Sequence, residues 1–106
     1  MWVREAEGEV IGYYVLMAAV GEAHLLNLTI APMWRRHGLG RDLLDHCLAR
    51  ACDHRAGSVF LEVRTSNTTA IALYRSSGFV DLAVRRGYYP AREGREDALI
   101  MKKDLA

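Results

Sequence analysis

The chain has 106 residues, of which 51% are apolar and 25% are charged, a composition typical of a single globular domain spanning residues 1–106. Lys and Arg number 14 against 13 Asp and Glu, so the charge balance argues against a general attraction to nucleic acid or to a membrane surface. No apolar run approaches the length of a membrane span, and the N-terminus lacks the pattern of a secretory signal, which predicts a cytoplasmic location.

The first third of the chain predicts three strands. Residues 2–6 and 10–20 are rich in β-branched and aromatic side chains, and the polar residues 7–9 between them predict a hairpin. Residues 24–30 form a nearly continuous apolar run that ends before Pro32. Such a run is typical of a strand that is covered on both faces.

An amphipathic helix is predicted over residues 39–55, with its end near Gly57. Its apolar stripe repeats at intervals of three and four residues and consists of Leu39, Leu43, Leu44, Cys47, Leu48, Ala51 and Cys52. Cys47 and Cys52 lie five residues apart and point to different faces of this helix, so they are poorly placed to form a disulfide. We expect two buried, reduced thiols.

A strand and a short helix follow. Residues 58–63 predict another buried strand, because they form a short apolar run. Ser66 or Asn67 can then cap a short helix, which Gly78 closes.

The last quarter of the chain predicts two further strands. They cover residues 80–89 and 98–102 and are joined by a charged turn that contains Pro90 and Gly94. The complete order is three strands, a helix, a strand, a helix and two strands. We therefore expect an α/β fold in which one mixed sheet carries packed helices.

Residues 35–41 read Arg-Arg-His-Gly-Leu-Gly-Arg and lie between a predicted strand and a predicted helix. Gly38 and Gly40 would let the chain turn tightly and bring main-chain N–H groups against an anion, beside the positive end of the helix dipole. Turns between strands and helices also use glycine for steric reasons alone. From these residues, phosphate binding and a purely steric role are both open.

Two titratable residues stand out by their positions. Glu62 lies inside an apolar run, where a carboxylate is out of character unless neighbours hydrogen-bond it or its side chain reaches solvent at the end of the sheet. A carboxylate in such a place could accept a proton near neutral pH. Tyr74 lies in the following helix and, without other evidence, is interpreted as a core tyrosine with a bonded hydroxyl.

The motif Arg35-Arg36-His37-Gly38-Leu39-Gly40 matches the Arg/Gln-x-x-Gly-x-Gly/Ala signature of the GCN5-related N-acetyltransferases. The chain resembles their RimI subfamily over residues about 10–101. The segments that carry this second resemblance are Leu61-Glu62-Val63-Arg64, Ser66-Asn67, Ala72-Leu73-Tyr74, Gly78-Phe79, Tyr88-Tyr89-Pro90 and Gly94-Arg95-Glu96-Asp97-Ala98. The resemblance implies a mixed, mostly antiparallel sheet flanked by helices. It also implies transfer of acetyl from acetyl-CoA to the N-terminal alanine of the eighteenth protein of the small ribosomal subunit.

The same resemblance implies roles for individual residues. Glu62 matches the proposed general base of the family, and Tyr74 matches its proposed general acid, in a direct attack of the amine without a covalent enzyme intermediate. The residues that the resemblance places at the co-substrate are Leu28, Thr29, Ile30, Arg35, Arg36, His37, Gly38, Leu39, Gly40, Arg41 and Asn67.

Among these, residues 28–30 would contact pantetheine through their main chain, and the amides of residues 36–41 would hold the pyrophosphate. Asn67 would contact CoA or simply cap its helix, and the two roles are compatible. The side chains of Arg35, Arg36 and Arg41 are either phosphate contacts or solvated surface charges.

No metal site is expected, because the four histidines and two cysteines lack the paired clusters that metal ligands show. Tyr88-Tyr89-Pro90 falls where the RimI pattern lies beside the acceptor peptide, and its alternative is a hydrophobic plug under the last hairpin. We expect acetyl-CoA and a ribosomal-protein N-terminus as partners, with no direct binding to nucleic acid or membrane.

Two departures from the family pattern are visible. Members usually carry a first strand and one or two helices ahead of the hairpin, and this chain starts almost inside it, so it is expected to be N-terminally shortened, with a bare sheet edge and exposed apolar faces. Gly87 stands where the RimI pattern commonly has Asn. The alternatives are therefore transfer to lysine side chains or small amines, and an inactive CoA-binding or interaction module.

Overall fold

The structure is a computed structural model that describes residues 1–6, 8–31 and 38–105. It contains eight elements within these ranges: β1 (Trp2–Ala6), β2 (Glu9–Ala19), β3 (Glu22–Ile30), α1 (Leu39–Asp53), β4 (Ser58–Arg64), α2 (Thr68–Ser76), β5 (Val80–Ala91) and β6 (Gly94–Asp104). The order of strands and helices confirms the order predicted from the sequence.

The strands form one mixed sheet in the order β1-β2-β3-β4-β6-β5. In the described chain, β3 and β4 are parallel, and every other neighbouring pair is antiparallel. A parallel pair needs a long crossover, which α1 supplies between β3 and β4. The predicted mixed, mostly antiparallel sheet is confirmed.

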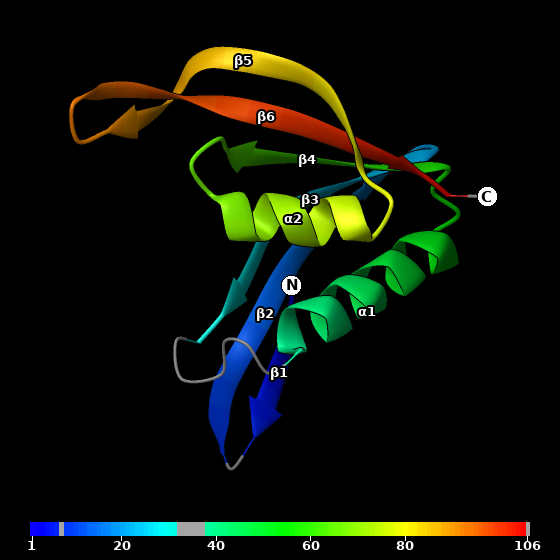
Figure 1. The fold of residues 1–106 in the computed structure, drawn as a ribbon. Coiled ribbons are helices and arrows are strands. Elements are labelled where there is room, and N and C mark those ends of the chain that lie inside the picture. The colour runs from blue at the N-terminus through cyan, green and yellow to red at the C-terminus, as the bar shows by residue number, and fades with distance from the viewer. Residues whose placement is uncertain (7, 32–37, 106) are drawn as a thin grey trace.

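The core lies between one face of this sheet and both helices (Figure 1). Val59, Leu61 and Val63 of β4 are at most 6% exposed and belong to the same cluster as the buried residues of α1, including Leu43 and Leu44. Side chains alternate between the two faces of a strand, so the residues between these positions point away from the helices.

The opposite face carries apolar side chains that are exposed. Leu26 of β3 is 59% exposed, and Val80 of β5 is 61% exposed. The prediction of a strand over residues 24–30 that is covered on both faces is therefore wrong for the described chain. The apolar run arises because one side meets the helices while the other side keeps apolar residues without cover.

Helix α1 ends earlier than predicted. His54 is its C-cap, and Arg55 takes the left-handed conformation, with φ of 61°, in the place expected for Gly57. The amides of Arg55 and Ala56 donate to the carbonyls of Cys52 and Ala51 at 2.8 and 3.1 Å, the two bonds of a Schellman cap.

Two smaller expectations are also corrected. Cys47 is buried but Cys52 is exposed, and both thiols are free, because Cys52 lies beside the stripe that faces the sheet. Strand β5 runs through Pro90 to Ala91, so the turn follows Pro90 instead of containing it. Proline is tolerated there because β5 is an edge strand.

Candidate active site

The strands β3 and β4 separate halfway along their length. Their ladder pairs Glu22 with Ser58 and ends at Leu25 with Leu61. At this point the β2–β3 register shifts, because Val15 pairs with Asn27 while Leu16 pairs with Leu25, which leaves Leu26 as a bulge in β3.

Beyond the bulge the two strands follow different partners. β3 continues with β2 to Ile30, whereas β4 continues with β6 to Arg64, so the two halves of the sheet spread apart (Figure 1). Over residues 26–29 the side of β3 that faces β4 belongs to no ladder in the described chain. Main-chain groups there can bind an extended ligand in place of a strand.

Residues Leu28, Thr29 and Ile30 lie on this separated part of β3 and are half-buried. Gly12 of β2 lies opposite Ile30 in the ladder. A Cβ on Gly12 would lie 2.8 Å from Cδ1 of Leu43 and 3.1 Å from the carbonyl oxygen of Thr29, so any other residue would force Leu43 or the β3 backbone to shift where α1 packs against these strands. Sequence reasoning missed this residue, although an isolated glycine inside a strand signals a close backbone approach.

The N-terminus of α1 has a conformation suited to an anion. Gly38 is its N-cap in the left-handed conformation, with φ of 73°, and has no side chain to bond the first amides of the helix. Its carbonyl accepts from the amide of Asp42 at 3.1 Å. The amides of Leu39, Gly40 and Arg41 are thus left without a side-chain cap at the positive end of the helix dipole.

The second glycine of the motif has a packing role. A Cβ on Gly40 would lie 3.3 Å from Cδ2 of Leu73, so this residue lets the start of α1 approach α2 closely. The guanidinium of Arg41 reaches the hydroxyls of Ser76 and Ser77 at the end of α2 and joins the two helices from their surface. The steric role is therefore found at Gly40, and phosphate binding at the turn of Gly38 stays a prediction.

The remaining motif residues Arg35, Arg36 and His37 lie outside the described residues. Asn67 is the N-cap of α2, and its Oδ1 accepts from the amide of Ala70 at 3.3 Å. The predicted cap is confirmed, and the CoA contact stays a prediction.

Glu62 points to the face opposite the core. Its side chain is 34% exposed, and its Oε1 lies 3.2 Å from Nη1 of Arg85 on β5. The carboxylate is therefore not enclosed in an apolar strand, because β4 is covered by helices on one face only. The alternative in which its side chain reaches solvent fits the structure better.

Tyr74 lies on α2 and is 7% exposed, with its ring packed edge-on against Phe79 at 5.8 Å between centroids. Burial, together with smaller contributions from Cys47 and Tyr89, raises its pKa to about 12. Within the described residues its hydroxyl has no hydrogen-bond partner, although the oxygen is not fully enclosed. The interpretation as a core tyrosine holds for the ring, but a bonded hydroxyl is not found.

A pocket of about 420 Å³ opens where β3 and β4 separate, on the face that carries Glu62. We call it the β3–β4 pocket, and it is lined by His24, Leu25, Leu26, Phe60, Leu61, Glu62, Tyr88, Tyr89 and Ile100. Burial raises the pKa of Tyr89, and the neighbouring carboxylate of Glu62 and phenol of Tyr88 add to the increase. Tyr89 and Glu62 thus line the same pocket.

A wide bulge in β5 brings the two tyrosines to this pocket. Arg85 pairs with Ala98 and Tyr89 pairs with Glu96. The chain therefore advances by four residues in β5 over a stretch in which β6 advances by two. Gly87, with φ of 62°, supplies the left-handed turn of the bulge.

Side chains of β6 hold the bulge in place. Asp97 accepts from the amide of Gly87 at 2.9 Å, and Arg95 donates to the carbonyls of Gly87 and Tyr88 at 2.5 and 3.1 Å. Glu96 accepts from the amide of Ser66 at 2.8 Å, and hydrogen bonding by the side chain and then the amide of Ser66 lowers the pKa of Glu96. Residues 94–98, which carry part of the family resemblance, therefore also supply charged side chains that support the pocket wall.

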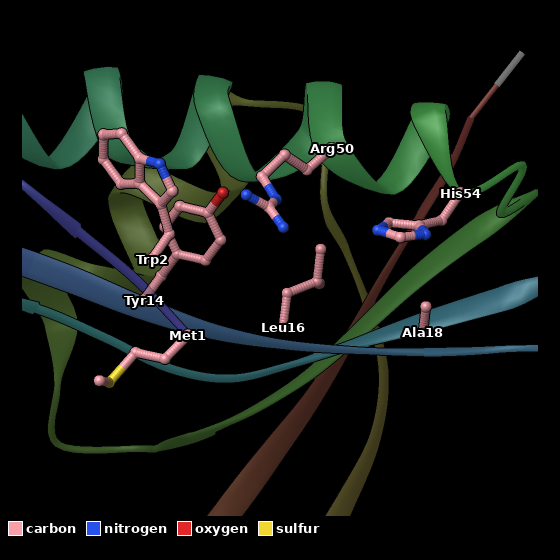
Figure 2. Close-up of a pocket in the computed structure, with 7 residues that line it drawn as sticks. All are labelled: Met1, Trp2, Tyr14, Leu16, Ala18, Arg50 and His54. Atoms are coloured by element: carbon pink, nitrogen blue, oxygen red, sulfur yellow. The ribbon is translucent and has the colours of Figure 1, made fainter.

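A second pocket lies between β1, β2 and α1 (Figure 2). Its volume of about 30 Å³ is enough for about one water molecule, so it is too small for a nucleotide. It is lined by Met1, Trp2, Tyr14, Leu16, Ala18, Arg50 and His54. Figure 2 shows the rings of Trp2 and Tyr14 side by side beneath α1, and their centroids are 5.7 Å apart.

No group of three or more His, Cys, Asp or Glu side chains is arranged to hold a metal ion in residues 1–6, 8–31 and 38–105. Over the same ranges, no helix is long and apolar enough to cross a membrane.

The separated parallel strands, the uncapped glycine turn before α1 and the strand order are those of an acetyltransferase fold. Residues 1–79 match the Acetyltransferase (GNAT) family, and the chain belongs to this family.

Similar proteins agree with this assignment. The chain is 43% identical over 94 residues to the [Ribosomal protein bS18]-alanine N-acetyltransferase of Escherichia coli strain K12, an alignment that covers 89% of the chain and 64% of that relative. The chain thus spans somewhat less than two thirds of the length of this relative.

Solved structures show the same fold. The crystal structure of the ribosomal-protein-S18-alanine N-acetyltransferase from Escherichia coli superposes with a TM-score of 0.90 at 39% identity, covering 96% of this chain and 66% of that one. A GNAT family acetyltransferase from Elizabethkingia anophelis with acetyl-CoA bound superposes with a TM-score of 0.87 at 23% identity, covering 97% and 74%.

Proposed function

We propose that this chain carries the acetyl-CoA site and the catalytic groups of an N-acetyltransferase that acts on a protein N-terminal amine. The N-terminal alanine of a small-subunit ribosomal protein is the favoured acceptor. The observation that carries the proposal is that the β3–β4 pocket opens where the two parallel strands separate and has both Glu62 and Tyr89 in its wall. The 43% identity to an alanine N-acetyltransferase supports the choice of acceptor.

The residues present fit the co-substrate. The amides of Leu39, Gly40 and Arg41 would hold its pyrophosphate, because Gly38 leaves them without a side-chain cap. The main chain of residues 28–30 would hold pantetheine where β3 has left β4. When bound, acetyl-CoA supplies an activated thioester for acyl transfer. The side chains of Arg35 and Arg36 and the main chain of His37 remain expected contacts, as does Asn67.

Glu62 is the proposed general base. An α-ammonium group has a pKa of about 8 and is mostly protonated at neutral pH, so it must lose a proton before the amine can attack. The carboxylate of Glu62 would accept this proton, directly or through a water molecule. Its partial exposure at the β3–β4 pocket leaves room for an acceptor.

Tyr74 is the proposed donor to the leaving sulfur. Its pKa of about 12 keeps the hydroxyl protonated at neutral pH. A thiol has a pKa of about 8.5, roughly three pKa units below that of this phenol, so full proton transfer from the phenol to a thiolate is unfavourable. We therefore assign Tyr74 chiefly a hydrogen bond to the sulfur as negative charge develops there.

The reaction is placed in the cytoplasm, where free thiols such as Cys47 and Cys52 persist. CoA release measured with three acceptors tests the proposal: a peptide that begins with Ala, a blocked peptide with an internal lysine, and a small polyamine. We expect the Ala peptide to give the highest kcat/KM. Faster turnover of either other class would reassign the acceptor, and acetyl-CoA binding without release of CoA would identify an inactive binding module.

A further inference from the structure

We propose that Arg85 is a positioning residue of the acceptor site, which fixes Glu62 and the aromatic wall of the β3–β4 pocket as one unit. This inference rests on the proposed function. Arg85 bonds one carboxylate oxygen of Glu62 at 3.2 Å, and its Cζ lies 4.3 Å from the centroid of the Tyr88 ring. One side chain therefore contacts both the proposed base and the wall that would face the acceptor.

The register of the sheet makes this contact possible. Glu62 pairs with Ile100, which pairs with Ala83 on β5, so these three residues form one row on the face opposite the core. Arg85 lies two residues farther along β5 and on the same face, because side chains alternate. Strand β6 lies between the two residues, and the long side chains of Arg85 and Glu62 together bridge it.

The bulge of β5 returns the chain over the guanidinium. Gly87 turns the backbone so that Tyr88 covers Arg85, and Tyr89 covers Arg64 at 4.5 Å in the same way. The rings of Tyr88 and Tyr89 lie edge to face at 4.9 Å between centroids. A guanidinium that stacks on an aromatic face and bonds a carboxylate loses much of its freedom, so it can orient the carboxylate.

As a chemical consequence, the two carboxylate oxygens of Glu62 have different roles. Arg85 bonds Oε1 and leaves Oε2 available to accept the proton of the incoming amine. Without Arg85 the carboxylate would rotate between side-chain conformers, and Tyr88 would lose the group beneath its ring. Misplacement of a catalytic group by about 1 Å can lower a rate by a factor on the order of 100.

A purely structural ion pair would behave differently. The side chains of Arg85 and Glu62 are 53% and 34% exposed, and pairs with such exposure contribute little to stability. Loss of Arg85 should thus leave folding nearly unchanged while lowering the transfer rate. The separation of these two effects identifies a positioning role.

The experiment compares Arg85→Met, which keeps the aliphatic stem and removes the charge, with Arg85→Lys, which keeps the charge. Arg86→Met is the matched control, since Arg86 is an exposed neighbour in the same strand. Each variant is measured for CoA release with the Ala peptide, for acetyl-CoA affinity and for its melting temperature. Arg85→Met is also combined with Glu62→Gln in a double-mutant cycle.

We expect Arg85→Met to lower kcat/KM for the peptide about 10- to 100-fold, with acetyl-CoA affinity unchanged within about twofold. Arg85→Lys should recover a large part of the loss, and Arg86→Met should match the unmodified chain. In the Glu62→Gln background, Arg85→Met should add less than about a twofold loss, because the group on which it acts is gone. Arg85→Gln replaces Arg85→Met if the latter does not fold.

Equal kcat/KM in Arg85→Met and the unmodified chain would overturn the inference alone, and so would an undiminished loss in the Glu62→Gln background. An unmodified chain that binds acetyl-CoA and releases no CoA with any acceptor would overturn the proposed function, and the inference would fall with it. The two failures are therefore distinguishable.

Discussion

The hydroxyl of Tyr14 lies 2.7 Å from Nδ1 of His46, and this contact joins β2 to α1 across the core. Tyr14 is 1% exposed, and the ring of Trp2 stacks on the imidazole of His46 at 3.9 Å between centroids. The three rings connect the N-terminal hairpin to the helix whose first turn is the proposed pyrophosphate site.

Tyr14→Phe should lower the free energy of unfolding by about 1–2 kcal/mol, because it removes one partner of a partly buried hydrogen bond and leaves Nδ1 of His46 unpaired. Urea denaturation followed by circular dichroism measures the loss. Tyr13→Phe, on the neighbouring and more exposed tyrosine, serves as the control. A loss of less than about 0.3 kcal/mol in Tyr14→Phe would mean that water replaces the hydroxyl.

Tyr74→Phe, in contrast, should lower the catalytic rate and leave the stability nearly unchanged. Its hydroxyl has no hydrogen-bond partner in the described residues, so the free energy of unfolding should change by less than about 0.5 kcal/mol. The rate of CoA release should fall roughly 100-fold, because the donor to the leaving sulfur is lost. Denaturation and steady-state kinetics on the same preparation separate the two effects. A variant that melts early and keeps its specific activity would assign Tyr74 to the core alone.

Alkaline pH should destabilise the fold through Cys47. Burial raises the pKa of this thiol from 9.0 to about 12, so above pH 9 the unfolded chain releases a proton that the folded chain retains. The unfolded state then binds fewer protons, and stability falls as the pH rises. The loss from this group should reach roughly 2–3 kcal/mol by pH 11.

Tyr14 and Tyr74, whose pKa values burial also raises to about 12, extend the same loss above pH 10. Urea denaturation at pH 8, 9, 10 and 11 tests this prediction. Cys47→Ala should make the free energy of unfolding fall less steeply with pH between pH 9 and 10. Cys52→Ala, at the exposed thiol, should leave the slope as it is. Equal slopes in both variants would contradict the assignment to Cys47.

Gly87→Asn should be tolerated, although Gly87 was noted as a departure from the RimI pattern. Its φ of 62° suits asparagine, and an added Cβ would meet Arg95 only at 3.8 Å, an ordinary contact. Gly87→Val should instead cost about 1–2 kcal/mol and lower peptide turnover, because a β-branched residue resists the left-handed conformation of the bulge. Thermal unfolding and CoA release compare the two variants, and similar losses in both would show that the bulge does not depend on φ.

Arg55→Gly should stabilise the chain by about 0.5–1 kcal/mol. Arg55 occupies the left-handed position of the α1 cap. This conformation is higher in free energy for a residue with a Cβ atom than for glycine. His54→Gly, one position earlier with a negative φ of −84°, should give no gain. Equilibrium denaturation of both variants decides the point, and a loss in Arg55→Gly would mean that the arginine side chain outweighs the strain.

Much of the secondary structure could be predicted from local patterns. The stripe of α1, the caps of α2 by Asn67 and Gly78, and the order of strands and helices depend on neighbours within a few residues. The glycine motif also places the proposed pyrophosphate site, because a strand, a left-handed turn and a helix start are contiguous in the chain.

The sequence by itself determined the elements, the family resemblance and the candidate residues Glu62 and Tyr74. Only the tertiary structure decided that Glu62 faces the uncovered side of the sheet beside Arg85, that Gly12 lies close beneath Leu43, and that, within the described residues, the hydroxyl of Tyr14 is bonded while that of Tyr74 is not. These partners are distant in the chain and meet through strand register, the bulge at Leu26 and the face that the helices cover. An apolar run has the same letters whether one face or both faces are buried, so local periodicity cannot distinguish the two.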